Sequence, residues 1–174
     1  YDSPEWKNAW QNWLRGVEAV MTKNQIKPED YCIEVWDEPH LEDAEKVINT
    51  CRLAKEACPD MRLQITFGAS RHSQATLDAL IPYVDIWCFW GAYFNDAKFR
   101  AFQQRLQENG KTIQLYYCDT NLRAPLYRYY RMHAWLGWYY GVDDLGLFTY
   151  TNGPGGYYGR GSWKTCLGGG VVYR

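Results

Sequence analysis

Helix-like and strand-like patterns alternate five times along this chain of 174 residues. The period of a helix with one buried face, three to four residues, occurs in the segments 4–24, 41–58, 77–82, 95–110 and 124–140. Asn95 is the expected N-cap of the fourth of these helices. Runs rich in β-branched and aromatic residues follow them at 31–36, 61–67, 85–90, 112–118 and 145–150. Strands that alternate with helices usually pair in parallel through right-handed crossovers. The pattern therefore predicts one α/β domain over residues 1–174, built around a parallel sheet.

Two architectures fit five parallel strands. A doubly wound sheet that binds a nucleotide carries a glycine-rich loop after its first strand, but Trp36-Asp37-Glu38-Pro39 occupies that place here. A complete (βα)8 TIM barrel takes about 250 residues, so this chain would be a partial barrel that lacks roughly its first three βα units. We expect the partial barrel, completed by the remainder of the parent polypeptide, and keep the open five-stranded parallel α/β sheet as the alternative.

Composition excludes several classes of partner. The formal net charge is -1, and no basic cluster is interleaved with aromatic residues, so we expect no nucleic acid partner. No apolar run approaches the roughly 20 residues of a membrane span. The six cysteines are scattered and the three histidines isolated, so we expect no metal and no cofactor. The unusual feature is 17% aromatic residues, whose flat faces suit stacking on sugar rings as well as packing in a core.

Two adjacent carboxylates end the strand predicted at 31–36. Pro39 cannot donate a ladder hydrogen bond, so pairing stops by about Glu38, and Asp37 and Glu38 lie at the carboxyl end of the strand. Ligands bind at that edge of parallel α/β folds. Like charges and a neighbouring hydrophobic wall such as Trp36 raise the pKa of a carboxyl group, which suits one of the pair to general acid catalysis. The competing interpretation is that one of them caps the following helix.

Further candidates for the wall of a binding site follow the other strands. We expect substrate-binding roles for residues at strand ends: Trp36, Trp87, Trp90, Tyr93, Tyr117, Asp119, Tyr150 and Asn152. Core packing is the competing role for Trp87. Asp119 is the one remote carboxylate at the carboxyl end of a strand and could serve as a conventional general base.

Three ordered segments resemble the catalytic domain of glycoside hydrolase family 123 and its relatives. They are Trp36-Asp37-Glu38-Pro39-His40, the segment RMHAWLGWYYGV at 131–142, and Gly168-Gly169-Gly170-Val171-Val172-Tyr173. The resemblance implies a (βα)8 barrel in which the five strands are the fourth to the eighth. One departure is that 147–152 reads LFTYTN where the family tends to carry a Trp, so a stacking ring is missing and the sugar specificity is open.

The chain has adjacent acids and no remote glutamate at a strand end, which favours substrate-assisted hydrolysis, in which the 2-acetamido group of the sugar is the nucleophile. Under this hypothesis Glu38 is the general acid and base, and Asp37 orients the acetamido group, as the resemblance also implies. The expected enzyme is a retaining β-N-acetylhexosaminidase acting on a glycan or glycoconjugate, with N-acetylgalactosamine favoured by the resemblance alone. An extracellular or periplasmic location follows from that substrate class. The alternatives are a non-catalytic carbohydrate-binding or structural barrel, and an open α/β domain with an unrelated small ligand.

Overall fold

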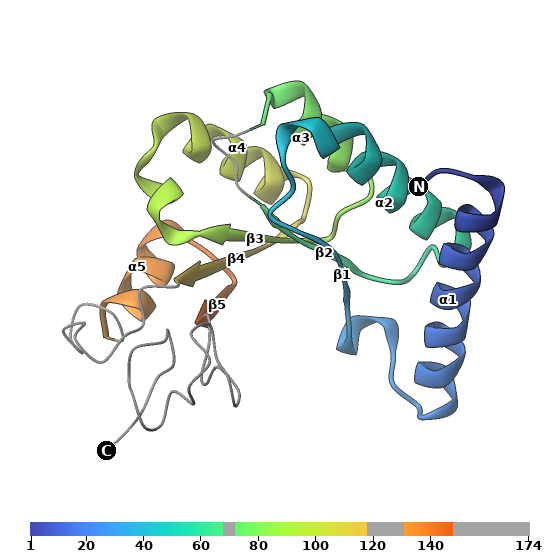
Figure 1. The fold of residues 1–174 in the computed structure, drawn as a ribbon. Coiled ribbons are helices and arrows are strands. Elements are labelled where there is room, and N and C mark those ends of the chain that lie inside the picture. Colours follow the sequence, from blue (N-terminus) through green and yellow to red (C-terminus); the bar gives the residue numbers. More distant parts are fainter. Residues whose placement is uncertain (68–71, 118–130, 148–174) are drawn as a thin grey trace, which may run out of the picture.

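The computed structural model describes residues 1–67, 72–117 and 131–147 (Figure 1). Five parallel strands form one open sheet in the order β1-β2-β3-β4-β5. They are β1 (Ile33–Asp37), β2 (Leu63–Phe67), β3 (Ile86–Trp90), β4 (Thr112–Tyr117) and β5 (Asp144–Leu147). The prediction of an α/β fold is thus confirmed, and in the described residues the sheet is the open five-stranded form.

In the described ranges, five α-helices alternate with these strands: α1 (Pro4–Lys23), α2 (Ala44–Ala57), α3 (Gln74–Leu80), α4 (Ala97–Glu108) and α5 (Met132–Tyr140). Short 3-10 helices occur at η1 (Pro28–Asp30), η2 (Leu41–Asp43) and η4 (Gly91–Asn95). The predicted segments agree with these elements to within a few residues, apart from the parts at 118, 124–130 and 148–150, which lie outside the described residues.

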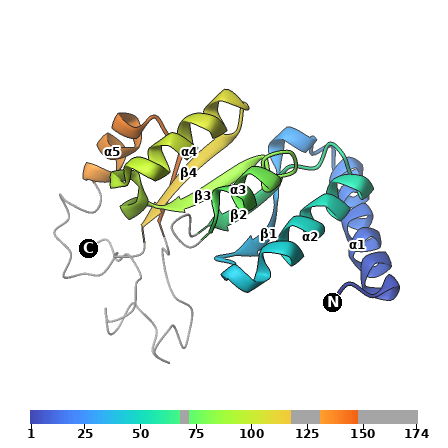
Figure 2. The same cartoon turned by 90° about the horizontal axis from the view of Figure 1, so that it is seen from above.

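The core fills the space between the sheet and one layer of helices. Figures 1 and 2 show α2, α3 and α4 side by side along the sheet. Every second residue of the central strands faces this layer, namely Leu63, Ile65, Phe67, Trp87, Phe89, Ile113 and Leu115, and all seven are buried. Opposite them pack Val47, Cys51 and Ala54 of α2, Leu77 and Leu80 of α3, and Phe99, Phe102 and Leu106 of α4. Full burial of a Leu or Phe side chain contributes about 1.5–3 kcal/mol, so this layer accounts for much of the stability.

The alternate residues of the strands form the other face of the sheet, which we call the acid face. It carries Glu34 and Asp37 of β1, Gln64 and Thr66 of β2, Ile86, Cys88 and Trp90 of β3, and Gln114 and Tyr116 of β4. Most of these side chains are polar, whereas the residues facing the helices are apolar. A sheet with one apolar and one polar face predicts that the polar face meets water or a ligand.

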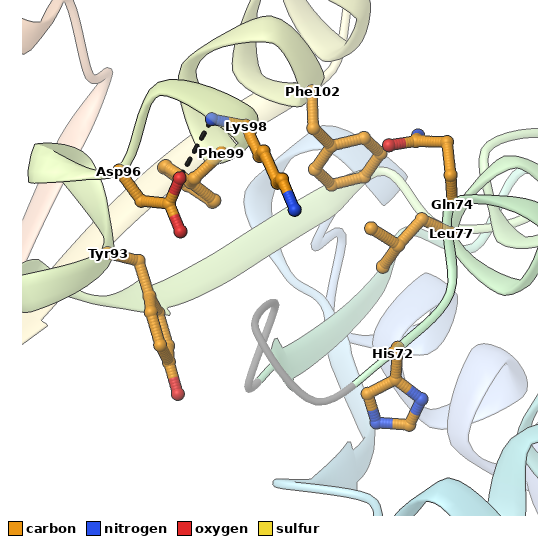
Figure 3. A pocket seen from close by; sticks show the side chains of 8 residues that line it. All are labelled: His72, Gln74, Leu77, Tyr93, Asp96, Lys98, Phe99 and Phe102. Carbon is orange, nitrogen blue, oxygen red and sulfur yellow. Dashed lines mark hydrogen bonds between the residues drawn. The ribbon is translucent and has the colours of Figure 1, made fainter.

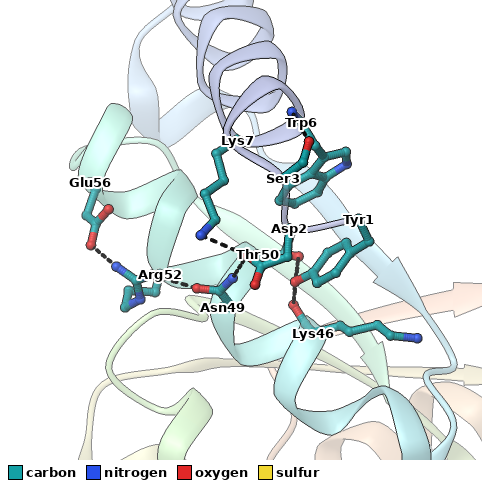
Figure 4. A network of polar contacts seen from close by, with 10 residues as sticks. All are labelled: Tyr1, Asp2, Ser3, Trp6, Lys7, Lys46, Asn49, Thr50, Arg52 and Glu56. Atoms are coloured by element: carbon teal, nitrogen blue, oxygen red, sulfur yellow. Dashed lines mark hydrogen bonds and ion pairs between the residues drawn. The ribbon is translucent and has the colours of Figure 1, made fainter.

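The first helix packs on α2 (Figure 4). Ser3 caps α1 by accepting a hydrogen bond from the backbone N–H of Trp6 at 3.2 Å. The Trp10 indole donates to the carbonyl of Thr50 at 3.3 Å, and the apolar stripe of α1 buries Leu14 completely. The N-terminal segment is held on α2 in the same way, because the Tyr1 phenol donates to the Lys46 carbonyl at 2.6 Å.

Helix caps differ from the sequence-based expectation at two places. Asp96, not Asn95, caps α4, because its Oδ1 accepts the backbone N–H of Lys98 at 2.8 Å. The Asn95 amide oxygen instead accepts the Tyr140 hydroxyl at 2.7 Å, which ties η4 to α5. The competing role of the acid pair as a helix cap is wrong as well, because the chain bends after Glu38 and the next helical turn begins only at Leu41.

Candidate active site at the carboxyl end of β1

A β-bulge in β1 determines where its acidic side chains lie. Glu34 is in register with Gln64 and Trp36 with Ile65, so Val35 is an extra residue in the strand. The shift brings Asp37 into register with Thr66. Without the bulge, residues 34 and 37 would point to opposite faces of the sheet, because side chains alternate along a strand. With it, Glu34 and Asp37 share the acid face.

Glu38 reaches the same face through an unusual backbone conformation. Its φ is 43°, in the left-handed region that residues with a side chain rarely adopt, and its N–H donates to the Thr66 carbonyl at 2.9 Å. Its carboxylate Oε1 accepts a hydrogen bond from the Tyr116 hydroxyl, and Tyr116 lies on the acid face of β4. In a regular strand, the neighbours Asp37 and Glu38 would point to opposite faces of the sheet. The turn at Glu38 instead directs both side chains to the acid face.

Pro39 and His72 hold this turn in place. Pro39 is buried, and its carbonyl oxygen lies 2.9 Å from Nε2 of His72. Because a carbonyl can only accept, Nε2 carries the proton and donates it. The His72 ring also packs on Phe67, with ring centroids 4.5 Å apart. Backbone strain of this kind persists only where surrounding contacts outweigh it, and such sites are often functional.

The surroundings of Asp37 on the acid face favour the protonated form of its carboxyl group. Partial burial raises the pKa of the Asp37 carboxyl, and the negative charges of Glu34 and Glu38 raise it further. Thr66 donates its hydroxyl proton to Oε1 of Glu34, which orients that carboxylate. The site thus combines a carboxyl group with increased affinity for a proton and a second carboxyl held by a phenol, a pairing suited to proton transfer.

Trp90, one of the predicted wall residues, adds an aromatic ring to the acid face. It is in register with Tyr116 and is half-buried. Its indole N–H is buried without a hydrogen-bond partner among the described residues. The ring meets Tyr93 of η4 edge-on at 5.9 Å between centroids. A Trp ring and a buried N–H donor on the same face of the sheet as the two acids are typical of a site for a polar ligand.

Two of the expected wall residues lie on the covered face instead. Trp87 is 0% exposed and contacts Phe67, Phe89 and Phe102, so it belongs to the core. Trp36 is in register with Ile65 and packs against the same core. Neither residue lies on the acid face. Trp87 alternates with Cys88 in β3, and the bulge at Val35 leaves Trp36 on the face opposite to Glu34 and Asp37.

The other predicted wall residues either line a different pocket or lie outside the described part of the structure. Tyr93 lines a separate pocket between α3 and α4, shown in Figure 3. Tyr117 ends β4, and its side chain lies outside the described part of the structure. Asp119, Tyr150 and Asn152 also lie outside the described residues, so their proposed substrate contacts and the base role of Asp119 remain predictions.

Sequence reasoning missed Glu34 and Tyr116, the two acid-face residues that act directly on Asp37 and Glu38. For Tyr116 a signal was present: Ile113 and Leu115 are apolar and Gln114 is polar, so alternation assigns Tyr116 to the polar face. For Glu34 no comparable signal exists. Only the bulge brings it beside Asp37, and nothing in the apolar run of β1 marks the position of that bulge.

Within residues 1–67, 72–117 and 131–147, no three His, Cys, Asp or Glu side chains are grouped so that they could hold a metal ion. No helix in these same ranges is long and apolar enough to cross a membrane. Comparison of the chain with models of known protein families finds no match, and a search of curated proteins finds no similar sequence.

Proposed function

We propose that this chain belongs to a glycoside hydrolase that removes terminal β-linked N-acetylhexosamine, with N-acetylgalactosamine favoured, by a retaining, substrate-assisted mechanism. The observation that supports this most is the convergence of Asp37 and Glu38 on one face at the carboxyl end of β1. Trp90 is in register with Tyr116, which donates to Glu38, and offers a ring on which a sugar can stack. The resemblance of the Asp-Glu-Pro segment to family 123 enzymes supplies the substrate class.

In this mechanism Glu38 transfers the protons. The 2-acetamido oxygen attacks the anomeric carbon, the glycosidic C–O bond breaks, and Glu38 donates its proton to the leaving oxygen. Water then attacks the anomeric carbon of the cyclic oxazolinium intermediate while Glu38 takes a proton from it. The bond to the acetamido oxygen breaks, and the sugar leaves with its original configuration. The Tyr116 hydroxyl orients the Glu38 carboxyl group throughout.

Asp37 acts on the acetamido group. Its carboxylate accepts the acetamido N–H and stabilises the positive charge that develops on the intermediate. Because the pKa of Asp37 is raised, its carboxylate is a stronger hydrogen-bond acceptor than an ordinary one. The same property also favours a second assignment, in which Asp37 carries the proton and Glu38 stabilises the charge.

We further propose that the sheet is part of a (βα)8 barrel, as its fourth to eighth strands, completed by the remainder of a longer polypeptide. Each strand pairs in parallel with its successor, as in a barrel, whereas a doubly wound sheet reverses its strand order at a switch point. The acid face would then be the barrel interior. A glycan substrate of this class also favours an extracellular or periplasmic location.

The test is hydrolysis of chromogenic β-N-acetylgalactosaminides and β-N-acetylglucosaminides by the full-length protein and its Glu38→Gln and Asp37→Asn variants. Loss of an acid–base group or of charge stabilisation lowers kcat by roughly 10²–10⁴-fold. Glu45→Gln is the matched control, because Glu45 is an exposed residue of α2 and not one of the acid-face residues.

The leaving group separates the two assignments. A leaving group of low pKa needs no proton, so the variant that loses the general acid retains cleavage of a dinitrophenyl glycoside but not of a methyl glycoside. Retained cleavage of the dinitrophenyl glycoside by Glu38→Gln supports Glu38 as the general acid. The same result for Asp37→Asn supports Asp37 as the general acid. Sugar binding without turnover by the folded wild type would instead favour the non-catalytic binding domain.

A further inference from the structure

A second concave site lies on the helix side of the sheet, between the N-terminal ends of α3 and α4 (Figure 3). Its volume is about 380 Å³, within the range of small-molecule sites. The floor is apolar and consists of the buried side chains Leu77, Phe99 and Phe102. An apolar floor of this size at the carboxyl ends of parallel strands is a place where ligands bind.

The rim of this pocket carries donors and acceptors whose charges cancel. The Lys98 ammonium group extends over the floor, and no ion pair with it occurs among the described residues (Figure 3). One oxygen of the Asp96 carboxylate caps α4, which leaves the other oxygen to accept from a ligand. Gln74 and the Tyr93 hydroxyl add groups that both donate and accept. With one positive and one negative side chain among the described residues of its rim, the pocket favours neither anions nor cations.

We infer that this pocket binds a neutral sugar residue. A sugar ring presents an apolar C–H face to the floor formed by Phe99, Phe102 and Leu77, while its hydroxyl groups accept from Lys98 and donate to Asp96. A purely apolar ligand would leave both charged groups without a partner. An organic anion would lie against the Asp96 carboxylate, and a cation against the Lys98 ammonium group.

The pocket is connected to the acid pair through one side chain. His72 lines the pocket and donates to the carbonyl of Pro39, the residue after Glu38. If the acid pair cleaves glycans, the pocket holds a further sugar residue of the same substrate, and this extension rests on the proposed function. The binding of a sugar in the pocket does not depend on it.

The experiment measures dissociation constants by saturation-transfer NMR with the full chain and three probes: methyl β-galactoside, the anionic methyl β-glucuronide and the cationic methyl β-glucosaminide. The pocket variants are Lys98→Met and Asp96→Ser, since serine keeps the helix cap and removes the charge. Lys46→Met is the matched control, because Lys46 is an exposed lysine of α2 that does not line the pocket. Glu38→Gln reports on binding at the acid pair.

We expect the neutral galactoside to bind more tightly than the two charged probes, and each pocket variant to weaken it about tenfold, the effect of one charged hydrogen bond. Lys46→Met leaves its affinity unchanged. Preference for the glucuronide, loss of binding only in Glu38→Gln, or no binding of the galactoside to the folded protein each overturn the inference. Pocket binding without hydrolysis would overturn the proposed function alone, and hydrolysis without pocket binding would overturn this inference alone.

Discussion

The Tyr116 hydroxyl donates a hydrogen bond to Oε1 of Glu38, although β2 and β3 lie between the strands that carry these residues. In a flat sheet, three strand spacings would hold the two backbones roughly 14 Å apart. The contact therefore requires both side chains to extend over the sheet toward one another. It joins two segments 78 residues apart in the sequence and makes the end of β4 part of the candidate site.

Replacement of Tyr116 by Phe should lower kcat for chromogenic β-N-acetylgalactosaminides by about tenfold to a hundredfold, with little change in KM. The reason is that a hydrogen bond to a charged group contributes about 1.5–3 kcal/mol, and here it orients a group that acts in the transition state. Steady-state kinetics measures both constants. Tyr139→Phe is the control, since Tyr139 is 64% exposed on α5. Equal kcat values for Tyr116→Phe and wild type would show that the phenol has no positioning role.

The stability gained by Asp37→Asn should depend on pH. Because the pKa of Asp37 is raised in the folded state, the native protein binds more protons than the unfolded chain above the unfolded pKa of about 3.9. The contribution of this group to stability therefore falls as pH rises from about 3.9 through the raised folded pKa. Asparagine removes that loss, so the variant should gain in urea midpoint relative to wild type at pH 7 and not at pH 3.5.

Glu34→Gln provides a check on the cause of this effect. The amide keeps an acceptor for Thr66 but removes one of the two charges that act on Asp37. The titration of the Asp37 carboxyl carbon, followed by NMR, should move to lower pH in this variant and stay in place in Glu45→Gln. An unchanged midpoint in Glu34→Gln would mean that the Glu34 charge does not raise the pKa of Asp37, which leaves burial and the Glu38 charge as its causes.

Substitution of Trp87 should mainly reduce stability, whereas substitution of Trp90 should mainly reduce substrate binding. Trp87→Ala leaves a cavity in the core and should reduce the free energy of unfolding by about 3–5 kcal/mol, as measured by urea denaturation. Trp90 is only half-buried, so Trp90→Ala should cost less stability and lower the affinity for substrate instead. The reverse order of the two unfolding free energies would contradict the assignment of Trp87 to the core.

Replacement of two glycines by alanine should change the stability of the protein in opposite directions. Gly141 ends α5 with a φ of 64°, where an added Cβ costs about 1–2 kcal/mol, so Gly141→Ala should lower Tm. Gly16 lies in α1, and an added Cβ there would meet no atom within 4 Å, so Gly16→Ala should raise stability by about 0.5–1 kcal/mol. Calorimetry of both variants tests this pair of predictions, and a rise in Tm for Gly141→Ala would exclude the left-handed cap.

The alternation of helices and strands was predictable because it depends on local periodicity. The predicted start of β1 at 31 and the cap at Asn95 were slightly wrong, since element ends depend on individual hydrogen bonds such as those of Asp96. The position of Asp37 and Glu38 at a strand end was also predictable, because Pro39 stops the pairing. These inferences need only the neighbours of each residue along the chain.

The sequence by itself determined the class of fold, the parallel strands and the presence of two adjacent acids at the end of β1. Only the tertiary structure decided which face each side chain occupies. A shift of one residue in register exchanges the two faces of a strand, and the bulge at Val35 makes such a shift in β1. It brings Glu34 beside Asp37, and the left-handed turn brings Glu38 to Tyr116. Both depend on contacts with β2 and β4, which residues distant in the sequence supply.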